Sequence, residues 1–320
     1  MSSPNATFTE LVSTTFRKHR KEIKDNLSNR NALLKYMMKR GNYRREDGGL
    51  SIATPLDYAA NSTYQRYSDW DLLNIGASDV ISSAEYQWRQ IALNVVSSGR
   101  ELRINSGDSR IINLAKAKIK NALRTFNNNF SSDLYSAGSL TNQINGLQAI
   151  IADTNTNTVG GIDANTWSFW QNTVLSAAAV SVTPSATTIE NGMMLPAWLT
   201  VDRGPDDQPD LIVMDNTYYQ YFEGSQVSLK RYASASNADG GFVGLKYKNA
   251  DVMFDGNSGI PSEHFYMINT NYLELVVHRD ADLEIMEEMR PINQDGAVVP
   301  ILWMGNLTCS NRKQQAVGKA

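Results

Sequence analysis

The sequence predicts an α+β protein in which a long helix follows an extended β-rich region. Apolar residues recur every three or four positions over Ser109–Ser136, which indicates one buried face of a helix. Before it, residues 62–97 are rich in Tyr, Trp, Ile, Leu and Val, which favour strands. After it, strand and helix signals alternate through residues 139–273, as they do in a mixed α+β domain.

The composition is that of an ordinary folded chain. The 320 residues are 42% hydrophobic and 20% charged, and a chain of this length buries roughly 75% of its unfolded surface. Its longest apolar runs, Leu175–Val182 and Val298–Met304, are far shorter than the ~20 residues that span a bilayer, so we expect no membrane partner. Cys309 is the only cysteine, which excludes an intrachain disulfide.

Charge is distributed unevenly along the chain. The first 45 residues hold eleven bases and three acids, a net charge of +8. The remaining residues hold 19 bases and 30 acids, a net charge of -11. Such a split suggests a basic arm with an acidic partner, which is either nucleic acid or the acidic body of another copy.

Residues 1–47 are predicted to form this arm, with helical stretches. A short helix is expected over Asn31–Arg40, and Gly41 can end it. Two interpretations stay open: the arm packs on its own domain, or it lies across a neighbouring copy. For the second interpretation the candidate contacts are Phe8, Phe16, Arg17, Lys18, Arg20, Lys21 and Met37.

Residues 48–99 are predicted to form an extended hairpin. Its two halves are expected over residues 62–75 and 80–97, with a turn at residues 76–79. About 14 residues at ~3.3 Å each span ~45 Å, which is too long for one compact domain to cover. The hairpin therefore either folds back on its own sheet or finds a third layer on a neighbour. The candidate contacts are Tyr64, Tyr67, Trp70, Tyr86 and Trp88.

The remaining elements are shorter. A strand-like run at Gly146–Ala152 and a turn at Gly160-Gly161 open the mixed domain. Alternation from Val299 to Cys309 predicts a strand with Cys309 on its buried face. The tail from Arg312 to Ala320 reads as frayed. Between these we expect a buried strand at Leu211–Met214, a helix Thr217–Phe222 capped by Asp215, an interrupted helix Thr187–Val201, a hairpin Gly244–Asp255 and β-structure over Phe265–Arg279.

No constellation of residues indicates catalysis. His19, His264 and His278 lie in unrelated contexts and none has a partner at metal-ligand spacing. The chain contains no nucleophile elbow, phosphate-binding loop or zinc-protease motif. We therefore predict no catalytic, cofactor-binding or metal-binding residues and no enzyme activity. A β-rich soluble enzyme or a glycan-binding module stays as an alternative of another class.

Short segments in a fixed order carry a family resemblance. They are Gly146-Leu147-Gln148, Val159-Gly160-Gly161-Ile162-Asp163 with Trp170, Pro209-Asp210-Leu211-Ile212-Val213 with Tyr218 and Tyr219, and Val299-Pro300-Ile301-Leu302 with Gly305-Asn306-Leu307 and Asn311-Arg312. The chain thereby resembles the major capsid proteins of tailed bacteriophages, which have the Hong Kong 97 (Johnson) fold. The resemblance implies an N-terminal arm (1–47), an extended hairpin loop (48–99), a spine helix of the peripheral domain (100–138), an axial domain (139–273) and returning peripheral strands (274–320).

The resemblance also implies a function and partners. Copies would assemble as hexamers and pentamers into an icosahedral virion capsid around double-stranded DNA, in the cytoplasm of a host bacterium. A portal and a decoration protein are implied partners. Because no helical leader precedes the arm, we expect no fused and cleaved scaffolding region, and a separate scaffolding protein or none. The chain has no lysine between Lys39 and Lys116, so an isopeptide bond from the hairpin is excluded and the shell is expected to be non-covalent there. An encapsulin-like compartment is the alternative with the same fold.

Overall fold

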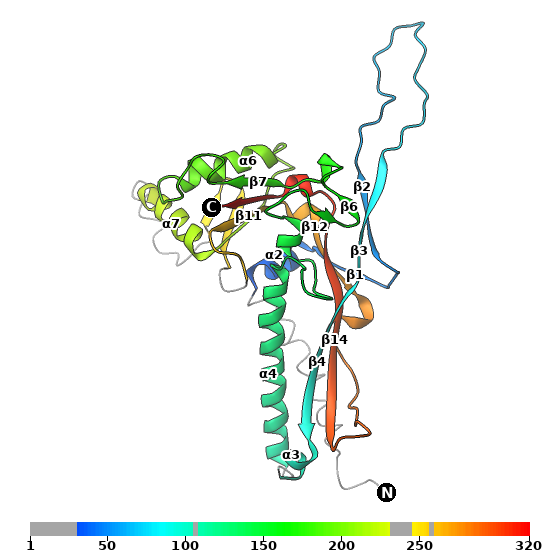
Figure 1. Ribbon diagram of the computed structural model, residues 1–320, viewed down its shortest axis with the longest axis vertical. Helices are drawn as coiled ribbons and strands as arrows, with labels where there is room; N and C mark the ends of the chain where they lie inside the picture. The colour runs from blue at the N-terminus through cyan, green and yellow to red at the C-terminus, as the bar shows by residue number, and fades with distance from the viewer. Residues whose placement is uncertain (1–30, 105–107, 231–244, 256–258) are drawn as a thin grey trace.

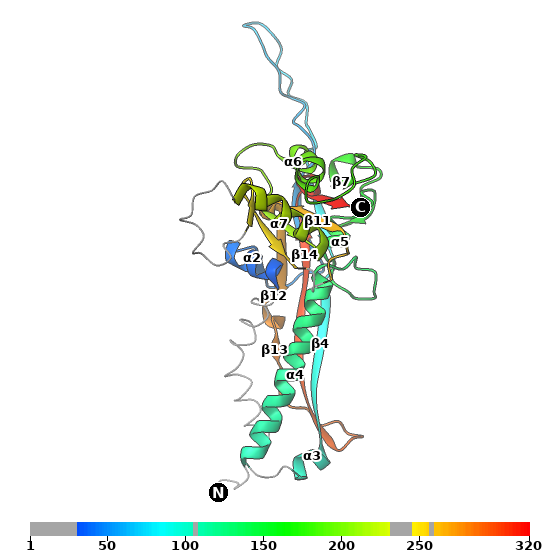
Figure 2. The ribbon, with the colours of Figure 1, turned by 90° about the vertical axis from the view of Figure 1, so that its left-hand side faces the viewer.

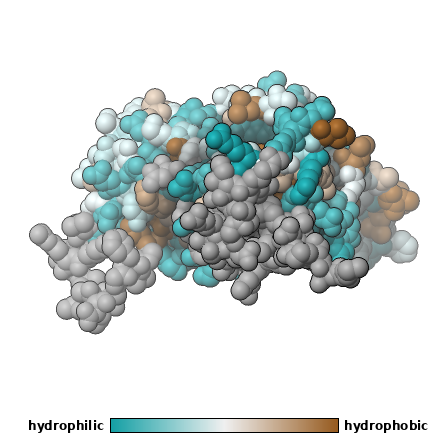
Figure 3. All heavy atoms as spheres, turned by 90° about the horizontal axis from the view of Figure 1, so that it is seen from below, coloured by the Kyte–Doolittle hydropathy of each residue, from teal (hydrophilic) through white to brown (hydrophobic). Residues whose placement is uncertain are grey.

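The computed structural model describes residues 31–104, 108–230, 245–255 and 259–320. The molecule is elongated: a mixed α/β head lies beside a long leg, and a thin hairpin projects from their junction away from the leg (Figure 1). Turning the molecule shows the same three parts, with the hairpin standing clear of the body (Figure 2). Seen along the leg, the described surface is mainly hydrophilic, with hydrophobic atoms in separate groups (Figure 3).

A five-stranded sheet forms the leg and its junction with the head. Its central strand, β14 (Gly296–Cys309), pairs along its length with β4 (Arg89–Ser98) in antiparallel register, from Gly296 opposite Ser98 to Gly305 opposite Arg89. Every second residue of β14 from Ala297 to Trp303 is buried, as the predicted alternation requires. The other strands are β1 (Tyr43–Glu46), β12 (Leu273–His278) and β13 (Glu284–Ile285).

The long helix α4 (Asp108–Leu134) covers this sheet and confirms the prediction for Ser109–Ser136 to within two residues at its C-terminal end. Its apolar stripe faces the strands: Phe126 stacks on Phe130 at 5.4 Å, and Phe130 meets Trp303 of β14 edge-on at 4.9 Å. The short helix α3 (Gly99–Ile104) connects β4 to α4 at the end of the leg.

A six-stranded sheet forms the head. Two helices flank it: α6 (Leu195–Val201), which continues a π-helical turn η2 (Ile189–Met194), and α7 (Asn216–Lys230). Pro196 lies in the first turn of α6, where its missing N–H costs nothing. The strand order is β7 (Thr173–Ser176), β15 (Ala316–Lys319), β11 (His264–Ile268), β8 (Leu211–Met214), β10 (Ala250–Phe254) and β9 (Leu245–Tyr247).

Several local predictions are confirmed. Asp215 caps α7 by accepting hydrogen bonds from the backbone of Thr217 and Tyr218 at 3.2 and 3.0 Å. All four residues of β8 are buried, and β9 and β10 form the expected hairpin. The helix α2 (Ala32–Arg40) begins after the cap Asn31 and ends at Gly41, which adopts the left-handed conformation.

Residues 146–152 do not form the predicted strand. Leu147–Ile150 is instead one helical turn, α5, that begins after Gly146. A short apolar run is compatible with both states, and only its tertiary setting separates them. The turn at Gly160-Gly161 is confirmed: it joins β5 (Thr158–Val159) to β6 (Ile162–Asp163), with both glycines at positive φ. The 3-10 turns η1 (Ser168–Trp170), η4 (Thr270–Tyr272), η5 (Arg279–Ala281) and η6 (Arg312–Gln314) complete the connections.

The prediction of a frayed tail is wrong. Residues 316–319 form β15, which lies between β7 and β11 in the head sheet. Arg312, just before it, is fully buried. Its guanidinium donates to the backbone oxygen of Ile150 at 2.7 Å and to the side-chain oxygens of Asn157 and Asn172 at 2.7 and 3.1 Å. The tail therefore completes the head sheet, and Arg312 binds the segments at Ile150, Asn157 and Asn172, instead of ending loosely.

Candidate intersubunit interface

The projecting hairpin consists of two short strands and a long loop. Strand β2 (Ile52–Asp57) pairs antiparallel with β3 (Ile81–Tyr86), from Ile52 opposite Tyr86 to Asp57 opposite Ile81. Alternate residues on one face of this ribbon are buried against the body, whereas the other face is exposed. Residues 58–80, here called the distal loop, join the two strands and carry the hairpin away from the molecule.

The predicted layout of the hairpin is therefore wrong in detail. The expected second half, residues 80–97, is divided between β3, which pairs with β2, and β4, which pairs with β14. The expected turn at residues 76–79 belongs to the returning limb. The reversal lies near Ser68 and Asp71, whose backbone oxygen and nitrogen are 3.0 Å apart. A β pattern identifies a strand but does not identify its partner, and β14 comes much later in the sequence.

The distal loop has no core of its own. No residue from 58 to 83 is buried. Side-chain amides join its two limbs: Gln65 Nε2 donates to the Leu72 oxygen at 2.9 Å, and Asn74 Nδ2 donates to the Ser62 oxygen at 3.1 Å. Large apolar side chains on the loop are exposed, and Trp70 is 97% exposed. The others are Tyr64, Tyr67, Leu72, Leu73 and Ile75. Isolated ribbons of this kind are marginal in water and need a further layer.

The base of the hairpin is held firmly against the body. The Tyr86 hydroxyl bonds to the backbone of Cys309, and burial raises the pKa of Tyr86 far above its usual range. The turn between β5 and β6 meets β3 from the side, where Glu85 N donates to the Gly160 oxygen at 2.9 Å. A Cβ on Gly160 would lie 2.8 Å from that of Ala84, so this contact requires a glycine.

The predicted contact residues fall into four groups. Tyr64, Tyr67 and Trp70 lie exposed on the distal loop. Met37 and Tyr86 are buried within their own subunit, so they are corrected from contact residues to core residues: the stripe of α2 and the inner face of β3 point inward. Trp88 is half-buried: Nε1 donates to the Gly49 oxygen at 3.0 Å, and its ring meets His278 edge-on at 5.6 Å. Phe8, Phe16, Arg17, Lys18, Arg20 and Lys21 lie outside the described residues.

Sequence reasoning missed further exposed apolar residues. Leu72 and Ile75 on the distal loop were read as part of a strand pattern, but both are almost fully exposed. Ile292, in the loop between β13 and β14, is fully exposed. The run Trp70-Asp71-Leu72-Leu73 was the available signal, because four residues with three large apolar side chains and no helical or strand partner indicate a contact surface.

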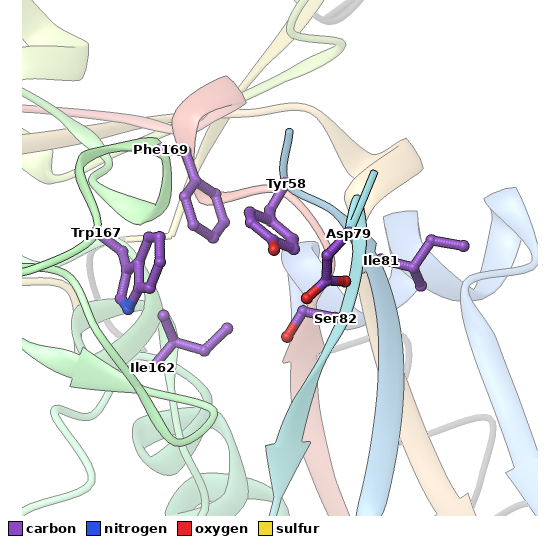
Figure 4. A pocket seen from close by; sticks show the side chains of 7 residues that line it. All are labelled: Tyr58, Asp79, Ile81, Ser82, Ile162, Trp167 and Phe169. Atoms are coloured by element: carbon purple, nitrogen blue, oxygen red, sulfur yellow. The ribbon is translucent and has the colours of Figure 1, made fainter. Parts of the chain in front are cut away.

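A small pocket lies at the base of the hairpin, between the distal loop and the segment that follows β6. Figure 4 shows Trp167 and Ile162 on one side of the hollow, Tyr58, Asp79 and Ser82 on the other, and Phe169 closing one end. Its volume is about 180 Å³. The rings of Tyr58, Trp167 and Phe169 form a triangle with centroid separations of 5.9, 5.8 and 6.0 Å. We call this feature the root pocket; Ile81 completes its lining at the outer edge.

The outer face of α4 is basic over its described side chains. Lys120 and Arg124 are exposed there, whereas Lys118 turns back toward β4 and pairs with Glu101 at 2.5 Å. That hydrogen bond lowers the pKa of Glu101. Within the described part of the chain, no three His, Cys, Asp or Glu side chains gather at metal-binding distance. No helix among the described residues has the length and apolarity to cross a membrane.

Comparison with known proteins gives a match in structure without one in sequence. No family model and no curated protein matches the chain. The capsid of cyanophage A-1(L) has a TM-score of 0.64 at 15% identity, covering 87% of this chain and 90% of that one. The encapsulin SrpI of Synechococcus elongatus PCC 7942 has a TM-score of 0.53 at 8% identity, covering 87% and 84%. The capsid of Myoviridae phage XM1 has a TM-score of 0.52 at 11% identity, covering 89% and 91%.

These likenesses extend over nearly the whole length of each partner chain. The expected fold is therefore confirmed: this chain has the Hong Kong 97 fold of phage capsid and encapsulin shell subunits. The long helix, leg sheet, head sheet and projecting hairpin described above are the parts of this fold in the present chain.

Proposed function

We propose that this chain is the major capsid protein of a tailed bacteriophage. Its copies assemble as hexamers and pentamers into an icosahedral head that encloses double-stranded DNA. Its role is structural and not catalytic. Assembly takes place in the cytoplasm of a host bacterium, and the product is the virion capsid.

One observation carries this proposal beyond the fold. The hairpin leaves its own subunit, and no residue from 58 to 83 is buried there, although this stretch holds Trp70, Leu72 and Ile75. Monomeric soluble proteins rarely expose so many large apolar side chains together. A shell of identical copies supplies the missing layer, because each hairpin then lies on the next subunit.

The charges of the chain support the same arrangement. Residues 50–88 hold five acids and a single base, Arg66. The exposed face of α4 offers Lys120 and Arg124, and the first 30 residues carry six bases and three acids. Opposite charges on adjoining copies set register and encounter rate, and the apolar side chains of the distal loop supply most of the strength.

Further partners follow from the role. A portal and a separate scaffolding protein take part in assembly, and a decoration protein is a possible addition to the outer surface. Contact with DNA is non-specific and electrostatic. Each hairpin contact is non-covalent, because the hairpin contains no lysine that could form an isopeptide bond.

The test is to remove the distal loop while keeping the strands. Residues 60–78 are replaced by Asn-Gly, a two-residue turn that suits the β2–β3 ribbon. We expect a folded subunit with unchanged helix content by circular dichroism and no shells by electron microscopy. The control replaces Ser62 and Ser68 with alanine and keeps the loop. Normal shells from the loop-deleted chain would contradict the proposal. A deletion through residue 97 would be uninformative, because it removes β3 and β4.

An encapsulin-like compartment is the second candidate, since the structure of the SrpI encapsulin also matches. The two functions differ in what the shell contains. Nuclease-resistant double-stranded DNA in purified particles supports the phage head, whereas a co-purifying protein cargo and no protected DNA support the compartment.

A further inference from the structure

We propose that the root pocket receives a lysine or arginine side chain from residues 17–24 of a second copy of this chain. This inference rests on the proposed function and deepens it, because it assigns the basic arm a receiving site on its neighbour. The site is formed by Tyr58, Asp79, Trp167 and Phe169, which come from the hairpin base and from the segment after β6.

The pocket has the chemistry of a cation site. Three aromatic rings whose centroids are 5.8–6.0 Å apart pack together in its lining, two pairs edge-on and one pair tilted. A cation over the exposed face of one of these rings, within ~6 Å of its centroid, is attracted by the ring. The carboxylate of Asp79 lies on the wall beside them and is the only charged group in the lining. A basic side chain thus finds both an aromatic surface and a counter-charge.

The pocket has the size of a single side chain. Its volume is about 180 Å³, below the roughly 300–1,000 Å³ of sites that hold free metabolites. A cavity of about 150 Å³ is enough to hold a benzene ring. The apolar walls, Ile162 and Phe169, suit the methylene stem of lysine or arginine, whose charged end then reaches Asp79.

The three arginines of the described arm already pair with acidic side chains of their own subunit. Arg40 pairs with Asp210 at 3.1 Å, and Arg45 pairs with Asp282 at 2.7 Å. The chain is thus fixed to its own body from Asn31 onward. Residues 17–24 carry Arg17, Lys18, Arg20, Lys21 and Lys24, and lie seven to fourteen positions earlier. An extended chain of that length spans about 25–50 Å, which is enough to reach an adjoining copy.

Cross-linking between two kinds of subunit tests this contact directly. One chain carries Ser82→Cys in the pocket lining; a second carries His19→Cys or Glu22→Cys, which leaves every arm base in place. The native Cys309 does not react with the maleimide, because it is buried and burial raises its pKa to about 12. We expect co-assembled shells treated with a short bis-maleimide to give a heterodimer band. The control partner carries Asn249→Cys in the exposed turn between β9 and β10 of the head.

A charge pair provides the second test. Asp79→Asn is expected to raise the critical concentration for shell assembly about tenfold, and less at high salt. The matched control is Asp57→Asn, which removes an exposed carboxylate from the same hairpin but outside the pocket. Combined with Lys21→Gln or Arg20→Gln, Asp79→Asn should give a non-additive effect, whereas Asp57→Asn should give an additive one.

Two results overturn the inference. One is the absence of the heterodimer from shells that assemble normally, or its appearance with Asn249→Cys alone. The other is an equal effect of Asp79→Asn and Asp57→Asn. Both leave the proposed function intact, because shells still form. Failure of the unaltered chain to form any particle is a different outcome, and it contradicts the proposed function instead.

Discussion

The hydroxyl of Tyr86 in the hairpin bonds twice to the backbone of Cys309 at the end of β14. It donates to the Cys309 oxygen at 2.9 Å and accepts from the Cys309 nitrogen at 3.2 Å. Cys309 pairs with Leu273 of β12, and the Tyr86 hydroxyl in addition bonds both of its backbone polar groups. The hydroxyl connects the hairpin base to the point where the leg sheet meets the head, and both residues are fully buried.

Removing that hydroxyl is expected to destabilise the subunit. Tyr86→Phe leaves a buried backbone N–H and C=O without their partner, which costs about 1–3 kcal/mol of unfolding free energy. Denaturant unfolding of the unassembled subunit measures the loss. Tyr64→Phe is the control, because the Tyr64 side chain is 80% exposed and its hydroxyl is solvated. Equal stability of the two variants would contradict the structural role of Tyr86.

Replacing Arg312 is expected to lower the free energy of unfolding more than replacing Tyr86. Its buried guanidinium is surrounded by neutral oxygens of Ile150, Asn157 and Asn172, and Arg312→Leu leaves all three acceptors unsatisfied. We expect a loss of about 3 kcal/mol or more, measured as a fall in the unfolding midpoint. The neighbouring Lys313 is exposed, so Lys313→Leu should change the midpoint little.

The thiol of Cys309 is expected to be inert in the folded protein. Burial disfavours the thiolate and raises the pKa of Cys309 to about 12, so the thiol stays protonated at pH 8. A thiol reagent should label the chain only after unfolding in denaturant, when the pKa returns to about 8.5. Rapid labelling of the native subunit at pH 8 would show that the end of β14 opens readily.

Exposed and buried apolar residues should separate assembly from stability. Trp70→Ser on the distal loop should leave the unfolding free energy unchanged and reduce shell yield, because Trp70 is 97% exposed in the isolated subunit. Met37→Ser should do the opposite and cost about 3 kcal/mol or more, because Met37 is fully buried. Sedimentation of shells and denaturant unfolding measure the two effects. A destabilised Trp70→Ser subunit would indicate a contact within its own chain.

Local sequence signals predicted those parts of the fold whose stabilising residues lie close together in the chain. The stripe of α4 repeats over seven turns, and the caps Asn31 and Asp215 act on backbone groups three residues away. The alternation of apolar residues along β14 likewise predicts one buried face. In each case a single segment contains the evidence for its own state.

Features that depend on distant partners escaped prediction. The strand at residues 89–98 was assigned to the hairpin because its pattern does not specify β14 as its partner. Arg312 was placed in a loose tail because its acceptors, such as Asn172, are neutral and remote in sequence. The root pocket was missed for the same reason: Tyr58 and Trp167 become neighbours only after folding.

The position of β15 has a consequence for synthesis on the ribosome. This strand joins β7 to β11, so the head sheet stays in two parts until residues 316–319 have been translated. Pairings between segments so far apart in the chain form slowly, because a large loop must close first. A nascent chain displays its hairpin long before it has a complete head. Under the proposed function, we expect a chain to join a growing shell only after residues 316–319 have completed its head.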